Sequence, residues 1–172
     1  MRIKFLLLSI FVALIAFTSC KKTTVNSAAT AFSNDISANV DGLFFSADSG
    51  TYFEIYKDEW NGKIYNEINF ESYDSKGNDF YIWLGTTDSI FTNKTYGAYG
   101  DSTSFAGIEF DSTGGNEYWS NTVLNPATIT ITSSIASGLK ATFNGTAYYD
   151  GDTTQTGSNK KAITNGKFSL SY

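Results

Sequence analysis

Two neighbouring segments, residues 63–73 (KIYNEINFESY) and residues 79–85 (DFYIWLG), indicate the fold class most clearly. In both segments apolar and polar side chains alternate with a period of two, which is typical of a β-strand with one buried face. The apolar side chains that share the expected core face are Ile64, Ile68, Phe70, Phe80, Ile82 and Leu84. We therefore expect two adjacent strands that bury the same face.

The opposite face of these two segments carries aromatic side chains. Tyr65, Tyr81 and Trp83 all alternate with the apolar residues. Rings on an exposed sheet face can stack on sugar rings or pack against a partner. The alternative, which we favour on general grounds, is that the rings are buried or stabilise the sheet as cross-strand pairs. Tyr65, Tyr81 and Trp83 are the candidate ligand-binding residues, and Trp60 and Trp119 lie beside predicted turns, where ligand contacts often occur.

The same alternation continues towards the C-terminus. It recurs in residues 127–133, 139–149 and 167–172, where Phe168, Leu170 and Tyr172 share a face. The dipeptides Asp41-Gly42, Asn61-Gly62 and Gly114-Gly115 tolerate the positive φ angles of tight hairpin turns, and Lys76-Gly77-Asn78 resembles a slightly longer turn. About ten short strands are expected in all.

The spacing of glycine leaves little room for a long helix. From Gly42 onward, the longest run without glycine lies between Gly115 and Gly138, and Pro126 interrupts it. An antiparallel meander must bury one face, either as two packed sheets or as a closed barrel. We favour an all-β, antiparallel β-sandwich, with a lipocalin-like closed barrel as the alternative.

The N-terminus has the features of an export signal. Arg2 and Lys4 precede the apolar run Phe5–Phe17, which is shorter than the roughly 20 residues needed to span a bilayer as a helix. The single cysteine of the chain, Cys20, follows directly after Thr18 and Ser19. This arrangement resembles a bacterial lipoprotein signal. The resemblance implies that residues 1–19 are removed and that Cys20 becomes the acylated, palmitate-bearing N-terminus.

Downstream of Cys20 the chain divides into a tether and a domain. Residues 20–35 are small and polar without periodicity, which predicts a flexible tether. Residues 36–172 have the size of one domain. Lys21 and Lys22 follow the cysteine without an acidic neighbour, and by resemblance to lipoprotein sorting signals this favours the outer membrane.

Composition limits the chemistry of the mature chain. It has no histidine and no arginine, and removal of Arg2 and Lys4 leaves a formal net charge of about −7. Such a chain is a poor nucleic-acid binder, and we expect neither catalysis nor a cofactor. A carboxylate pair, such as Glu67 with Glu109, would depend on the strand register.

Calcium is the metal that this composition permits, because it binds carboxylate and carbonyl oxygens. Asp150 and Asp152 flank a glycine in an acidic loop, as do Asp74 and Asp79 farther upstream. Neither loop has the spacing of an EF-hand, so a solvated turn is the favoured interpretation.

Three further segments are informative: Ile36–Ala47 (ISANVDGLFFSA), Phe143–Ala147 and Ala162–Ser169 (AITNGKFS). They resemble segments of a family of uncharacterised cell-envelope lipoproteins common in the Bacteroidetes. The resemblance implies an all-β domain outside the cytoplasm and supplies no catalytic motif. We therefore expect a lipid-anchored, non-enzymatic binding or interaction module with a protein or glycan partner. A carbohydrate-binding lipoprotein of a glycan-uptake system and a carrier of small apolar ligands stay open as alternatives.

Overall fold

The computed structural model describes residues 32–47, 49–88, 94–97, 103–120, 127–150, 152, 154 and 157–172. The expected signal peptide of residues 1–19, Cys20 and the tether up to residue 31 lie outside the described residues. Residues 32–35, the end of the expected tether, lead directly into the first strand.

The described residues form eleven β-strands and no helix, which confirms the all-β class. The strands are β1 (Asp35–Val40), β2 (Leu43–Ser46), β3 (Ser49–Trp60), β4 (Lys63–Tyr73), β5 (Asp79–Thr86), β6 (Thr95–Tyr96), β7 (Ser104–Ser112), β8 (Asn116–Trp119), β9 (Thr128–Ile135), β10 (Gly138–Tyr149) and β11 (Lys160–Ser171). In this part of the chain no helix has the length and apolar character needed to cross a membrane.

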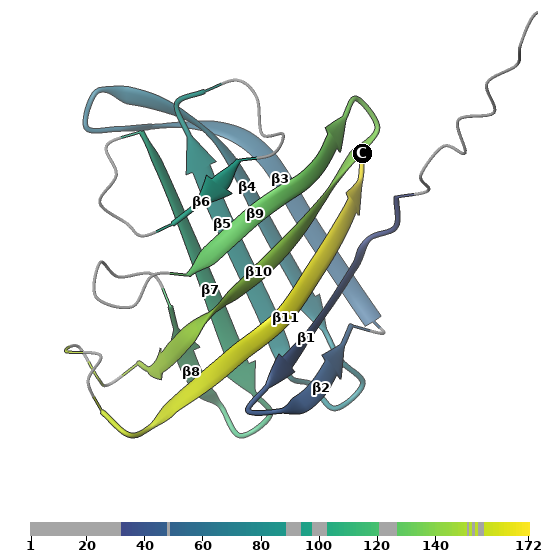
Figure 1. Ribbon diagram of the computed structural model, residues 1–172, viewed down its shortest axis with the longest axis vertical. Helices are drawn as coiled ribbons and strands as arrows, with labels where there is room; N and C mark the ends of the chain where they lie inside the picture. The colour runs from purple at the N-terminus through teal and green to yellow at the C-terminus, as the bar shows by residue number, and fades with distance from the viewer. Residues whose placement is uncertain are drawn as a thin grey trace, which may run out of the picture. The chain divides into compact units, whose positions relative to one another are not determined.

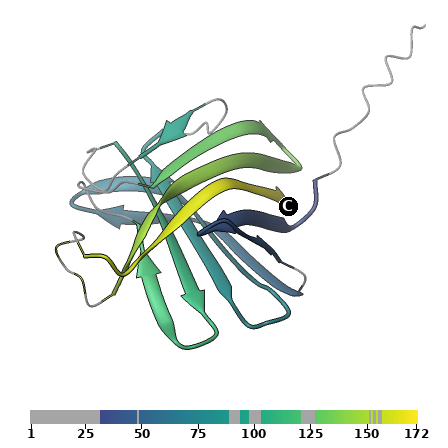
Figure 2. The same cartoon turned by 60° about the horizontal axis from the view of Figure 1, so that its bottom comes forward.

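All strand pairs are antiparallel and belong to one continuous sheet (Figure 1). Its order is β2-β1-β11-β10-β8-β7-β5-β4-β3, and β9 pairs with both β10 and β6. The sheet curls so that strands β1, β9, β10 and β11 cross over strands β3, β4, β5 and β7 (Figure 2). The result is two packed layers, as in the expected sandwich, but joined by hydrogen bonds at one side. The order ends at β2 and β3, so the curled sheet stays open.

Aromatic rings fill the space between the two layers. Phe70 of β4 lies 5.4 Å from Phe168 of β11, measured between ring centroids. Phe80 of β5 lies 5.8 Å from Phe143 of β10 and 4.7 Å from Phe45 of β2. These side chains are almost fully buried, and together with the buried aliphatic residues they form one hydrophobic cluster. The inner faces of the strands therefore make the core.

A bend in β10 joins the two layers. Residues 138–144 pair with β9 on one side of the strand, whereas Tyr148 and Tyr149 pair with β8. The register with β11 shifts between Phe143 and Gly145, which marks a β-bulge. A Cβ atom on Gly145 would lie 2.6 Å from Oγ of Ser120, so glycine is needed where the strand changes partner.

Two of the three predicted tight turns have the expected conformation; at the third, only Gly115 has a positive φ angle, 75°, in a three-residue turn between Ser112 and Asn116. Asp41 and Gly42 have φ angles of 50° and 81°, and Asn61 and Gly62 have φ angles of 50° and 73°. Two consecutive positive φ angles are the signature of a type I′ hairpin turn. The sequence therefore predicted the β1–β2 and β3–β4 hairpins correctly.

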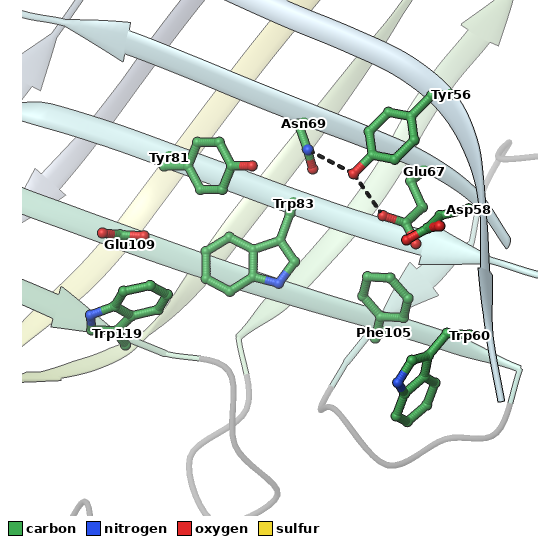
Figure 3. A pocket seen from close by; sticks show the side chains of 10 residues that line it. All are labelled: Tyr56, Asp58, Trp60, Glu67, Asn69, Tyr81, Trp83, Phe105, Glu109 and Trp119. Atoms are coloured by element: carbon green, nitrogen blue, oxygen red, sulfur yellow. Dashed lines mark hydrogen bonds between the residues drawn. The ribbon is translucent and has the colours of Figure 1, made fainter. Parts of the chain in front are cut away.

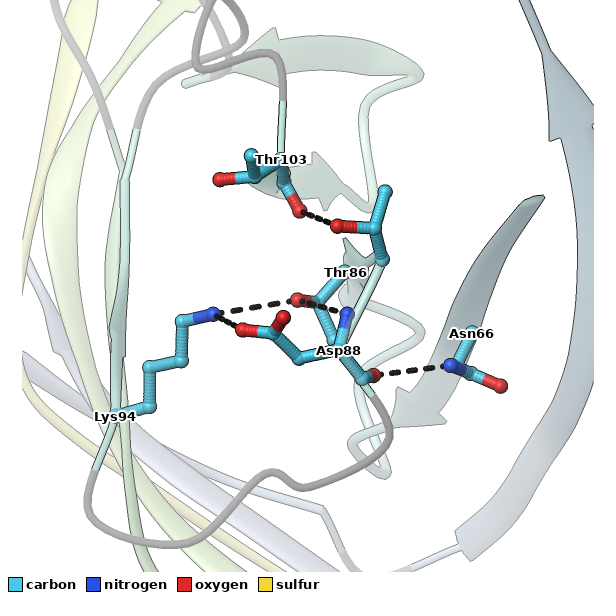
Figure 4. Close-up of polar contacts among 6 residues, drawn as sticks. Asn66, Thr86, Asp88, Lys94 and Thr103 are labelled. Carbon is cyan, nitrogen blue, oxygen red and sulfur yellow. Dashed lines mark hydrogen bonds and ion pairs between the residues drawn. The ribbon is translucent and has the colours of Figure 1, made fainter. Parts of the chain in front are cut away.

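Polar contacts hold the end of β5 against its neighbours (Figure 4). Nδ2 of Asn66 donates to the carbonyl oxygen of Asp88 at 2.9 Å, which ties the segment after β5 to β4. Nζ of Lys94 donates to Oγ1 of Thr86 at 3.3 Å and forms an ion pair with the Asp88 carboxylate. The end of β5 is therefore fixed on both sides.

The predicted core faces are confirmed except at two positions. Ile64 and Tyr172 share a face with core residues but are 60% and 46% exposed, respectively. Ile64 adjoins the β3–β4 turn and Tyr172 is the last residue, so the second layer does not cover them. Alternation specifies which way a side chain points, but it does not specify how far the covering layer extends.

Candidate functional site

A cleft of about 270 Å³ lies on the outer face of strands β3, β4, β5, β7 and β8 (Figure 3). This face is opposite the hydrophobic core. The side chains that line the cleft are Tyr56, Asp58, Trp60, Glu67, Asn69, Tyr81, Trp83, Phe105, Glu109 and Trp119. The cleft therefore combines aromatic rings with carboxylates and one amide.

Strand register brings these side chains together. Tyr81 of β5 lies between Glu71 of β4 and Glu109 of β7, and Glu109 is paired in turn with Trp119 of β8. Trp83 lies in the next row. Since directly paired residues point to the same face, each row carries its side chains into the cleft side by side. The candidate residues Tyr81 and Trp83, and the turn-adjacent Trp60 and Trp119, all line this cleft.

Two glycines let aromatic rings lie across neighbouring strands. Gly107 is paired with Trp83, and a Cβ atom on Gly107 would lie 2.1 Å from Cζ2 of the indole. Gly85 is paired with Phe105, and a Cβ atom there would lie 2.3 Å from Cζ of the phenyl ring. Both rings therefore occupy the space above a glycine and form the floor of the cleft.

The rings of Tyr81, Trp83 and Trp119 form a continuous platform. The centroids of Tyr81 and Trp83 are 5.4 Å apart, and those of Trp83 and Trp119 are 5.8 Å apart with an interplanar angle of 69°. Nε1 of Trp119 is buried without a hydrogen-bond partner. The platform is thus half-buried, and the indole N–H of Trp119 is enclosed without an acceptor among the described residues.

Tyr65 does not line the cleft, although it lies on the same face. Its side chain is 1% exposed. Trp60 and Phe105 pack over it, with ring centroids at 6.4 Å and 5.5 Å, respectively. The candidate residue Tyr65 is therefore buried, as the favoured alternative predicts, because side chains from β3 and β7 cover it. Trp60 and Phe105, which cover Tyr65, line the cleft instead.

Hydrogen bonds fix the polar side of the cleft. The hydroxyl of Tyr56 donates to Oε2 of Glu67 at 3.0 Å, and Nδ2 of Asn69 donates to the Tyr56 oxygen at 2.9 Å (Figure 3). Burial and the bond to Glu67 raise the pKa of Tyr56 to about 12. Burial raises the pKa of Glu67, and the nearby charge of Asp58 adds to this effect. The hydrogen bond from Tyr56 lowers the pKa and offsets part of the rise.

Carboxylates crowd the other end of the cleft. Burial, followed by the charges of Asp111 and Glu117, raises the pKa of Glu109 to about 8. Burial and the charge of Glu117 also raise the pKa of Asp111. Oδ1 atoms of the directly paired Asp79 and Asp111 are buried without partners. The crowding of these acidic groups therefore reduces the negative charge at this end, and Glu109, with a pKa of about 8, is largely protonated at pH 7.

Glu67 and Glu109 are not cross-strand partners. Glu67 is opposite Gly85, whereas Glu109 is opposite Tyr81. Four residues along a strand and two strand spacings separate their Cα atoms by about 16 Å. Both carboxylates nevertheless line the cleft, one at each end.

The acidic loops use their carboxylates for their own turns. Oδ1 of Asp152 accepts from Oγ1 of Thr154 at 2.7 Å, and Oδ2 accepts from the Gly157 amide at 2.6 Å. Asp150 is exposed, and Asp74 accepts bonds within its own turn. Within the described ranges, no three acidic, His or Cys side chains are grouped to hold a metal ion. For Asp150 and Asp152, a solvated turn stays the favoured interpretation, with calcium binding as the alternative.

Beyond Trp60, the contribution of β3 to the cleft was not predicted. The outer face of β3 carries Tyr52, Glu54, Tyr56, Asp58 and Trp60, an alternation of aromatic and acidic side chains, and the last three of these line the cleft. That alternation is visible in the sequence and would have indicated the polar rim. Phe105 and Glu109 could be found only through register, because their own segment gives no comparable signal.

Comparison of the chain with known protein families, curated proteins and solved structures returned no match.

Proposed function

We propose that this chain is a lipid-anchored, non-enzymatic binding protein of the cell envelope that holds a carbohydrate in the aromatic cleft. One observation carries the proposal: the Tyr81–Trp83–Trp119 platform lies on the outer face of the sheet, bordered by carboxylates. Sugar rings have apolar C–H faces that stack on aromatic rings and hydroxyls that donate to carboxylates. The cleft offers both kinds of contact side by side.

The dimensions of the cleft support a saccharide. Its volume of about 270 Å³ is near the lower end of the range for small-molecule sites. One or two sugar rings would fill it, and the rest of a longer glycan would extend over the acidic face. This accords with capture by a glycan-uptake system.

A carrier of small apolar ligands is less well supported. Such a carrier needs a hollow interior. Here the rings of Phe70, Phe80, Phe143 and Phe168 occupy the space between the layers. The outer face is the better candidate for binding.

The cellular location belongs to the same proposal. Cys20 would carry the acyl chains, and residues 21–35 would connect the domain to the membrane, most consistently the outer membrane. The resemblance to Bacteroidetes envelope lipoproteins supports this location. The anchor would place the cleft among the polymers of the cell surface or periplasm.

A glycan-binding screen with the full chain in detergent tests the proposal. We expect the wild-type protein to retain at least one oligosaccharide, and Trp83→Ala and Trp119→Ala to weaken that binding at least about tenfold through loss of the ring platform. Phe44→Ala is the matched control, because Phe44 is an exposed ring on β2, outside the cleft. Equal binding by all four proteins, or hydrolysis of the glycan, would refute the proposal.

A further inference from the structure

The outer face of strands β3, β4, β5, β7 and β8 is strongly acidic. Residues that share this face by register include the carboxylates Glu54, Asp58, Glu67, Glu71, Asp79, Glu109, Asp111 and Glu117. Among the described residues of these strands, the basic side chain on the same face is Lys63, beside the β3–β4 turn. Among the described residues that line the cleft, none is a lysine. The acidic groups of this face therefore have few basic partners in the described part of the protein.

The carboxylates are placed among the aromatic rings. Glu109 lies between Tyr81 and Trp119 in one cross-strand row. Glu67, only 8% exposed, accepts the hydrogen bond from Tyr56 near the other end. A half-buried carboxylate without a positive partner is costly, and a cation from outside would relieve that cost. Aromatic faces also attract cations, most strongly when these are desolvated.

We propose that the ligand is a cationic saccharide, whose sugar rings stack on the Tyr81–Trp83–Trp119 platform and whose protonated primary amines pair with Glu109 and Glu67. This inference rests on the proposed function and adds the charge class of the glycan. An ammonium group matches both the carboxylates and the ring faces. An anionic saccharide would be repelled by the same carboxylates, and the cleft offers no basic side chain to hold it.

A neutral saccharide would satisfy only half of the site. Its rings would stack, but its hydroxyls would leave the neighbouring acidic groups of Glu109, Asp111 and Glu117 without a positive partner. A basic peptide would supply charge without the flat C–H faces that suit three adjacent rings. The combination of platform and acidic rim is what favours an amine-bearing sugar.

The test compares two oligosaccharides that differ only in the acetyl group: glucosamine hexasaccharide and N-acetylglucosamine hexasaccharide. Calorimetry with the full chain in detergent at low salt gives both affinities. We expect the amine form to bind at least about tenfold more tightly. Glu109→Gln and Glu67→Gln should each reduce this preference several-fold, because each substitution removes a carboxylate that pairs with an amine.

Glu59→Gln is the matched control. Glu59 lies on β3 between cleft-facing residues but points to the other face of the strand, so its substitution should leave the preference unchanged. Hexalysine tests whether amines alone are sufficient, and we expect it to bind at least about tenfold more weakly than glucosamine hexasaccharide.

Each contrary result has a distinct meaning. Equal affinity for the two hexasaccharides would refute the proposed positive charge of the ligand and leave carbohydrate binding intact. Hexalysine binding as tightly as the amine sugar would refute the assignment of the ligand as a saccharide. Failure of both hexasaccharides would overturn this inference, and failure of every glycan in the wider screen would overturn the proposed function as well.

Discussion

Trp83 owes its position to a residue that has no side chain. The indole lies over Gly107, in space that a Cβ atom at position 107 would otherwise occupy. Phe105 depends on Gly85 in the same way. The floor of the cleft is therefore encoded as ring–glycine pairs across neighbouring strands.

Substitution of Gly107 tests this dependence. In Gly107→Ala the new Cβ would lie 2.1 Å from the indole, so Trp83 must move. We expect a loss of about 1–3 kcal/mol in the free energy of unfolding, as for other overpacked sites, and at least about tenfold weaker glycan binding. Urea denaturation and calorimetry measure the two effects.

The control for this variant is Gly97→Ala. A Cβ atom on Gly97 would have no neighbour within 4 Å, so stability and binding should change little. Unaltered affinity in Gly107→Ala would show that the position of the Trp83 indole is not important for the ligand.

Glu109 gives the protein a pH-dependent stability. Its pKa is about 8 in the folded protein because of burial and neighbouring carboxylates, well above its usual value near 4.5. Between these two pH values the folded state keeps the proton and the unfolded state has released it, so stability falls as pH rises from about 5 to 8. The raised pKa values of Asp79 and Asp111 act in the same direction.

Thermal unfolding at pH 5 and pH 8 measures this effect. The wild-type protein should melt at a lower temperature at pH 8, and Glu109→Gln should recover about 1–2 kcal/mol there, a value reduced for solvent screening. Glu59→Gln should follow the wild-type curve. A wild-type melting temperature that rises over this interval would contradict the burial of Glu109 among like charges.

At the level of the strands, the alternation of side chains and the turn residues were the sequence signals that best predicted where the strands lie and which face each side chain occupies. The segment 63–73 coincides with β4, and Tyr81 and Trp83 lie opposite Phe80 and Ile82, as expected. Register could not be predicted, because period-two patterns say nothing about which strands pair. The covering of Tyr65 by Trp60 and Phe105 therefore appears only in the folded structure.

The β3–β4 hairpin links local turn chemistry to the cleft. Gly62 has a φ angle of 73°, and Trp60 lies at the end of β3 just before the turn. In Gly62→Ala the strained turn should lower the free energy of unfolding by about 1 kcal/mol. It should also weaken glycan binding, because Trp60 shifts.

Urea denaturation and calorimetry again provide the measurements, with Gly97→Ala as the control for glycine replacement without positive φ. Full stability in Gly62→Ala would contradict the type I′ assignment of this turn.

For the whole molecule, the central feature is a single sheet folded into two layers. One face of each of the strands β1, β4, β5, β7, β9, β10 and β11 supplies the core. The layer made of β3, β4, β5, β7 and β8 keeps an outer face that no other described strand covers. The same sheet thus provides both a stable scaffold and a binding surface. The choice between sandwich and barrel could not be made from alternation, since both bury one face of each strand.

Attachment to the membrane is the prediction at this scale that depends on Cys20. If residue 20 is the acylated N-terminus, the native protein should fractionate with the envelope, and its mass should correspond to loss of residues 1–19 plus the acyl chains. Cys20→Ser should release it from the membrane, because the substitution removes the residue that carries the anchoring acyl chains. An unmodified Cys20 in full-length cytosolic protein would contradict the anchor.

Tryptophan fluorescence tests the central claim most directly, because all three tryptophans of the chain, Trp60, Trp83 and Trp119, line the cleft. Titration with glucosamine hexasaccharide should produce a saturable change in their emission, with the same midpoint as calorimetric binding, and Trp83→Ala should remove most of it. Calorimetric binding that leaves the emission of all three tryptophans unchanged would contradict the assignment of this cleft as the ligand site.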